Sequence, residues 1–388
     1  MNKHYFHRDS IFFYRNYFML ALPALITDPI YDPLTFRRKP GDLILQKCIK
    51  EERDLPFMRL FALIQVTVIP VAVLLFTPLL AGWMWWAVAI PYFYWSQFRL
   101  KGPFGLMLHC ICHRKVFKGQ YQWVFHYIVR FISPFFGHLG ESYLSHHLGM
   151  HHVEDNMPED KSSTMPYQRD NWRHFLLYWG RFMVLGWRET FQYLFNRKLK
   201  KFYVPLSWSE SLFIIGCFAL SYVNLKATLL VFVIPFLFAR LVMMLGNWTQ
   251  HAFVDPAEPE DCFASTFVCI NTPYNNKCWN DGYHALHHFR QAAHYTEYPV
   301  MFKQLLPRLA MKKSFVFCGV HYLHLFIWLM TKRYDKLAAH LVNINGAFEN
   351  EQDAIHLLKM RTRQFNLHHA GAIPSSGLEM VMADQVEG

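Results

Sequence analysis

The feature that most restricts the fold is a stretch of 39 residues, from Leu60 to Phe98, that contains no charged side chain. As a single helix it would be about 58 Å long, which is about twice the 30 Å thickness of a bilayer's hydrocarbon core. The simplest arrangement is a pair of membrane spans, at about 60–79 and 83–98, that fold back at Ala81 and Gly82. A pair of buried helices in a soluble core would rarely be so long and so free of charge.

A second apolar pair is predicted further along the chain, with spans at about 208–225 and 227–245 on either side of Lys226. The turns of both predicted hairpins are poor in Lys and Arg, whereas their open ends are rich in them. Cytoplasmic loops carry the excess of these residues. We therefore expect the insert at 99–205, and everything after residue 245, to lie in the cytosol.

The composition supports a membrane protein and argues against nucleic-acid binding. Hydrophobic residues make up 53% of the chain, aromatic residues 18%, and the formal net charge is +11. A nucleic-acid binder concentrates its basic residues in polar patches. Here Lys and Arg flank apolar segments, which is typical of a cytoplasmic face that meets anionic lipid.

Four spaced groups hold nine of the 22 histidines. Each group contains a pair at positions i and i+4, which a helix presents on one face, and each lies on the predicted cytosolic side. The groups can therefore meet just below the membrane. They are His109-Cys-Ile-Cys-His113, His147-Leu-Gly-Met-His151-His152, Asn247-Trp-Thr-Gln-His251 and His284-Ala-Leu-His287-His288.

Nine imidazoles and one amide are too many for a single ion, so the count predicts two metal ions with about five ligands each. Metal-bound histidines usually pass their second ring N–H to a carboxylate or another acceptor. Candidates for this orienting role are Glu141, Asp155, Asp160 and Asp281, and His294 is a further candidate next to the metal ligands.

Together these patterns predict an all-α membrane protein, with four transmembrane helices in two hairpins and a helical cytosolic cap that carries a histidine-rich di-metal site. Residues 1–59 form an N-terminal interfacial or cytosolic segment, within which 11–30 lies at the interface. Residues 60–313 form the main domain, residues 314–364 form C-terminal cap helices, and 365–388 is a flexible tail. The apolar stretch 314–330 is expected to be a helix that packs on the cap or lies in the interface, not a fifth span.

The order of spans and histidine groups resembles the integral-membrane fatty-acid desaturase and hydroxylase superfamily, over roughly Leu60–Pro299. The layout as a whole looks like the stearoyl-CoA desaturases. The His-xxx-His-His spacing of the second group, with Pro158-Glu-Asp-Lys-Ser-Ser after it, looks more like the bacterial alkane hydroxylases, because desaturases usually have one residue fewer inside this group.

The resemblance implies a non-haem di-iron centre that uses O2 to attack an unactivated C–H bond. Carried over residue by residue, it assigns the ligands to two irons, with Asn247 binding the second iron directly or through water. The first set is His109, His113, His147, His152 and His287, and the second is His151, His251, His284 and His288.

We expect an O2-dependent fatty acyl desaturase in the endoplasmic reticulum or a bacterial inner membrane, with its active site on the cytosolic side. Hydroxylation of an acyl chain or alkane, and oxidative decarboxylation of a fatty acid to a terminal alkene, remain open for the same site. A metal transporter is the non-enzymatic alternative, although the four predicted spans contain no histidine. The chain has no His-Pro-Gly-Gly motif and no Cys-xx-Cys pair, so electrons are expected from a separate donor of the cytochrome b5 or ferredoxin type.

Overall fold

The computed structural model describes residues 26–365. Most of the predicted interfacial segment at 11–30, and the predicted tail from 366 on, lie outside the described residues. The described chain begins with short helical turns that lead into the first long helix. They are α1 (Asp42–Leu45), η2 (Gln46–Cys48) and η3 (Glu52–Asp54).

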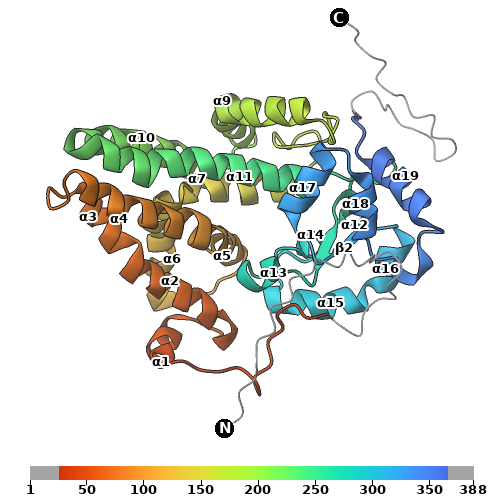
Figure 1. The fold of residues 1–388 in the computed structure, drawn as a ribbon, viewed down its shortest axis with the longest axis horizontal. Helices are drawn as coiled ribbons and strands as arrows, with labels where there is room; N and C mark the ends of the chain where they lie inside the picture. The colour runs from red at the N-terminus through yellow and green to blue at the C-terminus, as the bar shows by residue number, and fades with distance from the viewer. Residues whose placement is uncertain (1–25, 366–388) are drawn as a thin grey trace, which may run out of the picture.

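The first hairpin consists of apolar helices on either side of a turn at residues 77–82 (Figure 1). Its first arm is divided into two helices because Pro70 lacks the N–H that would continue the helical ladder. Its second arm runs without interruption into the first histidine group. The arms are α2 (Leu55–Thr67) with α3 (Ile69–Phe76), then α4 (Trp83–Phe93), the π-helical segment η4 (Tyr94–Leu100) and α5 (Lys101–His113).

The second hairpin is formed by α10 (Lys200–Thr228), the π-helical turn η9 (Leu229–Val233) and α11 (Ile234–Gln250). The chain reverses at Asn224, whose backbone has φ −159° and ψ 100°. Figure 1 shows α10 and α11 running beside each other and along the first hairpin. Apolar side chains such as Ile214 and Phe218 on α10 are more than half exposed, as expected for a surface that faces lipid rather than water.

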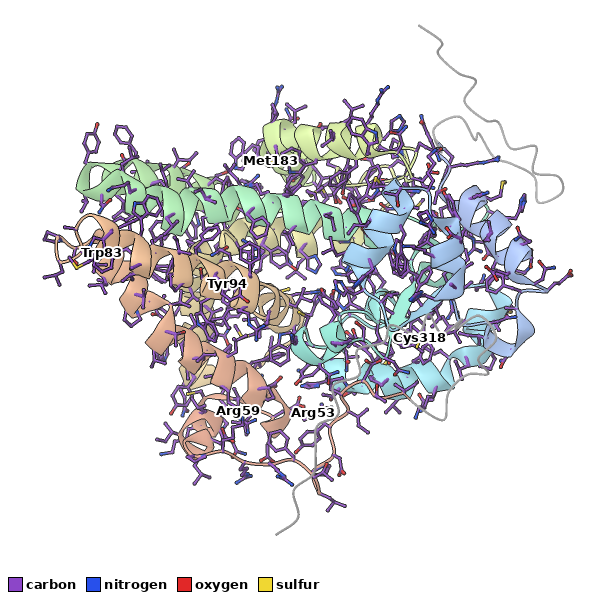
Figure 2. All side chains as sticks on the ribbon, in the orientation of Figure 1. Arg53, Arg59, Trp83, Tyr94, Met183 and Cys318 are labelled. Atoms are coloured by element: carbon purple, nitrogen blue, oxygen red, sulfur yellow. The ribbon has the colours of Figure 1, made fainter. Side chains whose placement is uncertain are left out.

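The turns of the two hairpins lie together at one end of the molecule. The Asn224 amide donates a hydrogen bond to the Leu75 carbonyl (3.2 Å), and the Lys226 ammonium lies 5.5 Å from the Trp85 ring centroid. Figure 2 shows Trp83 at this end. The histidine groups follow the opposite, open ends of the hairpins, so both hairpins present the site on the same side.

Two helical stretches of the described residues are long and apolar enough to cross a membrane, Glu52–Phe76 and Lys200–Gln250. The first covers most of the predicted span at 60–79, and the second, with its reversal at Asn224, covers both predicted spans of the second hairpin. The predicted span at 83–98 is helical but is not among these stretches. The number of four spans therefore stays a prediction.

Short helices between the hairpins carry the second histidine group and place it against α5 and α11. The segment ends in α9, which packs beside α10 and α11 (Figure 1). Its elements are η5 (Gly119–Tyr121), α6 (Gln122–Tyr127), η6 (Ile128–Ile132), η7 (Ser133–Phe136), α7 (Gly140–His146), the π-helical turn η8 (His147–His151), α8 (His152–Glu154) and α9 (Trp172–Asn196).

The C-terminal part is a compact set of short helices around two strands. β1 (Val268–Ile270) and β2 (Val316–Cys318) pair in parallel, with Val268 opposite Val316. The helices are α12 (Cys262–Ser265), α13 (Pro273–Lys277), α14 (His284–Phe289), η10 (Tyr295–Glu297), α15 (Tyr298–Gln304), α16 (Leu306–Met311), α17 (Tyr322–Met330), α18 (Tyr334–Ala339), η11 (Ile344–Gly346) and α19 (Glu351–Arg361).

This sheet corrects two predictions. The fold is mostly helical but not all-α, and the stretch 314–330 is a strand followed by a helix, not one helix. Phe315, Val316 and Phe317 are fully buried, and a short apolar run of this kind suits a buried strand as well as a helix. Gly319, at φ +77°, then ends the strand, and its N–H donates to the Ile270 carbonyl.

The turn before α7 requires glycine, because Gly137 has φ +77° and a Cβ there would collide with the backbone of Pro235 on α11. We predict that Gly137→Ala lowers the free energy of unfolding by about 2 kcal/mol or more, from backbone strain and from separation of η7 and α11. Gly180→Ala is the matched control, since a Cβ on that helical glycine meets open space and should stabilise by about 0.5–1 kcal/mol. Thermal unfolding in detergent would test this, and equal melting temperatures would contradict it.

Candidate metal centre

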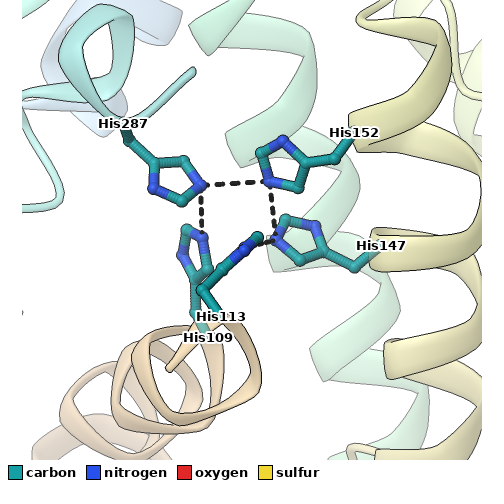
Figure 3. A group of neighbouring side chains, drawn as sticks. All are labelled: His109, His113, His147, His152 and His287. Atoms are coloured by element: carbon teal, nitrogen blue, oxygen red, sulfur yellow. Dashed lines mark hydrogen bonds between the residues drawn. The ribbon is translucent and has the colours of Figure 1, made fainter. Parts of the chain in front are cut away.

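The first group of converging histidines comes from three separate segments of the chain. Their nearest ring nitrogens all lie within 4.8 Å of one another, and Figure 3 shows the rings pointing to a common centre. The Nε2–Nε2 distances are 2.8 Å for His109–His287 and 3.0 Å for His113–His147, His147–His152 and His152–His287. The group consists of His109 and His113 from α5, His147 and His152 from the second histidine segment, and His287 from α14.

The second group lies beside the first. His151, His251 and His288 have ring nitrogens within 4.8 Å of one another. His284 adjoins them, with its Nε2 3.0 Å from that of His288 and 3.4 Å from that of His251. The structure thus gathers the nine histidines into the same two sets that the resemblance assigned to two irons.

The donor set fits two metal ions. A neutral imidazole has one N–H and one lone pair, so five Nε2 atoms that face one another cannot all be satisfied by hydrogen bonds alone. Nitrogens that share an ion, with bonds of about 2.0–2.1 Å at right angles, lie about 3 Å apart. The observed spacing of 2.8–3.0 Å agrees with that value. Imidazole ligands suit iron, as they suit zinc and copper.

A π-helical turn, η8, distributes the second histidine group between the two sets. Because each residue of a π-helix pairs with the fifth residue after it, His147 meets His152, and their ring centroids are 4.3 Å apart. His151 points to the other set instead. His147 and His151 therefore belong to different sets, as the resemblance implied, although their ring centroids are only 5.8 Å apart.

Carboxylates orient the second set through the outer ring nitrogens. His151 Nδ1 lies 2.7 Å from Asp160, and His288 Nδ1 lies 2.6 Å from Asp155. Asp160 is fixed in turn by the backbone N–H and hydroxyl of Ser162. These contacts aim each Nε2 at the centre of its set.

The first set is oriented more loosely. Asp281 lies 3.8 Å from His109 Nδ1 and accepts a hydrogen bond from the Tyr274 hydroxyl. The Tyr298 hydroxyl lies 3.2 Å from His287 Nδ1. Tyr298 was not identified from the sequence, because an isolated tyrosine outside the histidine groups carries no spacing signal.

Three predicted site residues lie apart from these sets. Asn247 donates through its amide nitrogen to the Ser162 carbonyl (2.9 Å) and the Tyr178 hydroxyl (2.7 Å), and it lines the cavity beside the metal centre. Glu141 pairs with Arg130 (2.7 Å). His294 is buried against Asp54 and Thr296, so neither Glu141 nor His294 contacts a histidine of the two sets.

A buried asparagine holds α14 in position. Asn275 donates to the Cys269 carbonyl of β1 (2.9 Å) and accepts from the N–H of Gly282 (3.0 Å), two residues before His284. A Cβ at Gly282 would lie 2.6 Å from the Cys269 carbonyl oxygen. The two-stranded sheet therefore fixes the fourth histidine group.

Burial keeps most of these rings neutral. Desolvation, followed by the neighbouring imidazoles, lowers the pKa of His109, His147 and His287 well below 6.5. His151 differs: burial lowers its pKa, but attraction to Asp160 outweighs burial and raises it. Neutral imidazoles are the form that binds metal.

A cavity of about 270 Å³ reaches both sets. Its polar lining includes His109, His147 and Asn247, and its apolar lining includes Phe238 and Val242, which lie four residues apart on one face of α11. Most of the exposed surface of this cavity is apolar although polar side chains also line it, which is typical of a binding site for a largely apolar molecule.

We predict that Asp160→Asn weakens metal binding about 10- to 100-fold, because the outer nitrogen of His151 loses its carboxylate partner. Metal content after dialysis against graded chelator would measure the effect. Asp353→Asn, which alters a surface carboxylate on α19 near Lys313, is the control. Equal metal retention by the two variants would contradict the orienting role.

We also predict that the metal-free protein loses stability as the pH falls through 6.5. Below this value the unfolded chain takes up protons on histidines whose pKa is depressed in the folded state, so more protons are bound on unfolding and the free energy of unfolding decreases. His151 has the opposite effect, because its raised pKa means that the folded state holds this one proton more tightly than the unfolded chain does. Denaturant titrations at several pH values would measure it, and stability that rises in acid would refute it.

Comparison with known proteins identifies the family. A family model for fatty acid desaturases matches residues 98–319, more than half of the chain and all four histidine groups. A search of curated proteins and a search of solved structures each gave no match. With the matched segment containing every member of the two histidine sets, the chain belongs to the fatty acid desaturase family.

Proposed function

We propose that this protein is a membrane-bound, O2-dependent di-iron oxidoreductase that introduces a double bond into a fatty acyl chain. The family implies an oxidoreductase of lipid metabolism. The observation that supports the specific proposal is the pair of adjacent histidine sets, which open onto one largely apolar cavity.

Nine histidines would hold two irons in this proposal. His109, His113, His147, His152 and His287 would bind the first, and His151, His251, His284 and His288 the second. Asn247, which lines the same cavity, would bind the second iron directly or through water. The iron pair would supply O2 activation and removal of hydrogen from an unactivated C–H bond.

The protein's own residues would position the substrate and exclude water. Phe238 and Val242 of α11 would hold the acyl chain in extended contact, so that geometry selects the carbon that reacts. Asp155 and Asp160 would keep the rings of the second set aimed at their centre. Burial of the histidines limits water at the reacting atoms.

We further propose that the two hairpins form four spans, with the site on the cytosolic side. The adjacent turns at one end and the histidine sets at the other support a common orientation. A separate electron donor would dock on the cytosolic face.

Expression in a host, with mass spectrometry of its lipids and volatile hydrocarbons, would test the reaction. We predict a new double bond, about two iron ions per chain, one for each histidine set, and complete loss of product in His151→Ala without loss from the membrane. His126→Ala, an exposed histidine of α6 outside both sets, is the control and should keep full activity.

Other products would indicate a different reaction at the same site. A hydroxylated chain would indicate hydroxylation, and a shortened terminal alkene would indicate decarboxylation. Undiminished product in His151→Ala would refute the site itself, and weakly bound, exchangeable zinc without product would favour transport.

A further inference from the structure

Arg240 is a charged residue inside an otherwise apolar helix. It lies on α11, within the predicted span 227–245, and only 14% of its side chain is exposed. Its Nη2 donates to Glu210 of α10 (2.7 Å). Charged side chains at such positions are costly and usually face the interior, where they line substrate pathways.

The ion pair leaves much of the guanidinium available. Arginine has five N–H donors, and one of them meets Glu210. The aromatic rings of Phe182 and Phe236 cover its flat faces, at 5.8 Å and 4.3 Å from Cζ. Arg240 is therefore held in one orientation while part of its donor edge remains open.

A small cavity of about 60 Å³ lies beside this edge, between α7, α9, α10 and α11. Residues His138, Tyr143, His146, Ala239 and Met243 line both this cavity and the 270 Å³ cavity at the metal centre. The two spaces therefore adjoin, with the histidine sets at one end and Arg240 at the other.

Two residues that line this small cavity each carry a buried polar atom without a partner among the described residues. The hydroxyl of Ser142, a residue only 9% exposed, and Nε2 of His146 are buried and have no hydrogen-bond partner among the described residues. Buried polar groups of this kind are normally paired, and leaving one unpaired costs about 1–3 kcal/mol. A ligand that accepts hydrogen bonds would satisfy them.

The cavity is also close to the metal centre. The His146 ring lies 5.7 Å from the Phe182 ring, which contacts Arg240, and 6.3 Å from the His151 ring. A group bound at Arg240 would therefore belong to the same molecule as the chain beside the histidines.

We infer that Arg240, with Ser142 and His146, binds the carboxylate of a free fatty acid. This inference rests on the proposed function and specifies its substrate. A carboxylate accepts paired hydrogen bonds from the arginine fork and further bonds from the hydroxyl and the ring N–H. Glu210 already balances the charge of Arg240. The Ser142 hydroxyl and the His146 ring N–H therefore supply the further hydrogen bonds that the carboxylate needs.

The alternatives fit less well. Coenzyme A carries several phosphate charges, which proteins bind with clusters of cations. Among the described residues that line the small cavity, Arg240 is the one Lys or Arg side chain. A methyl ester or an alkane carries no charge for it to bind.

The test uses the iron-loaded full chain in detergent and competition against a fluorescent fatty acid. Palmitic acid should displace the probe at least about tenfold more effectively than methyl palmitate, the loss expected when a charged hydrogen bond is removed. It should also displace the probe more effectively than palmitoyl-CoA. Equal displacement by acid and ester, or a preference for the CoA ester, would overturn the inference.

Variants separate ligand binding from a structural role of the ion pair. Arg240→Met and Glu210→Gln both break the pair, but only the first removes the cation. Arg240→Met should weaken palmitic acid binding about tenfold or more, whereas Glu210→Gln should leave it unchanged or tighter, because a competing carboxylate is gone. Equal weakening in both variants would refute the inference.

Arg181→Gln is the matched control, since Arg181 forms an ion pair with Glu189 on the surface of α9 and lines neither cavity. It should bind palmitic acid as the unaltered chain does. Iron content and product are measured in parallel. If the chain prefers the acid but forms no product, the carboxylate site stands and the proposed reaction is rejected. If product forms but Arg240→Met binds the acid unchanged, the reaction stands and the carboxylate site is rejected.

Discussion

The crowding of buried imidazole nitrogens is the constraint on which the candidate site depends. The first set brings five imidazole nitrogens to within 4.8 Å of one another in a buried place. Hydrogen bonds cannot satisfy all of them, and burial opposes protonation. A shared cation would resolve the conflict, and binding of metal would then be linked to the folding of the site.

The rest of the architecture supplies that arrangement from positions far apart in the chain. The two hairpins end at α5 and α11, which bring in His109 and His251, and their turns are tied together at the other end by Asn224 and Leu75. The two-stranded sheet supports His284 through Asn275. An error at any of these supports would move one ligand, which is why glycine is needed where Gly137 meets α11.

The sequence predicted what depends on residue type and on broad periodicity. Charge-free stretches indicated apolar hairpins, and histidine spacing indicated that the four groups converge, while their division into two sets came from the resemblance. It did not predict η8, because a π-helical turn differs from an α-helix by one residue and leaves no compositional mark. It also did not predict β2, because the buried run from Phe315 to Phe317 suits either structure until Val268 pairs with it. The role of Glu141 failed for a related reason: nearness in sequence to His147 does not fix which way a helical side chain points.

Two largely enclosed cations, Lys101 and Arg240, differ in how many of their N–H donors already have an acceptor. The Lys101 ammonium has three N–H donors, and it has three acceptors, in the Gln97 side chain (2.9 Å) and the carbonyls of Phe136 (2.8 Å) and Pro235 (3.1 Å). Nothing remains for a ligand, so Lys101 serves to join α5, η7 and the start of α11. Arg240 lies about one and a half turns after Pro235 on α11. It has one hydrogen-bond partner, Glu210, and an adjoining cavity. Along α11, Pro235 thus accepts from a lysine whose donors are all used, and Arg240 has donors left that suit the proposed carboxylate.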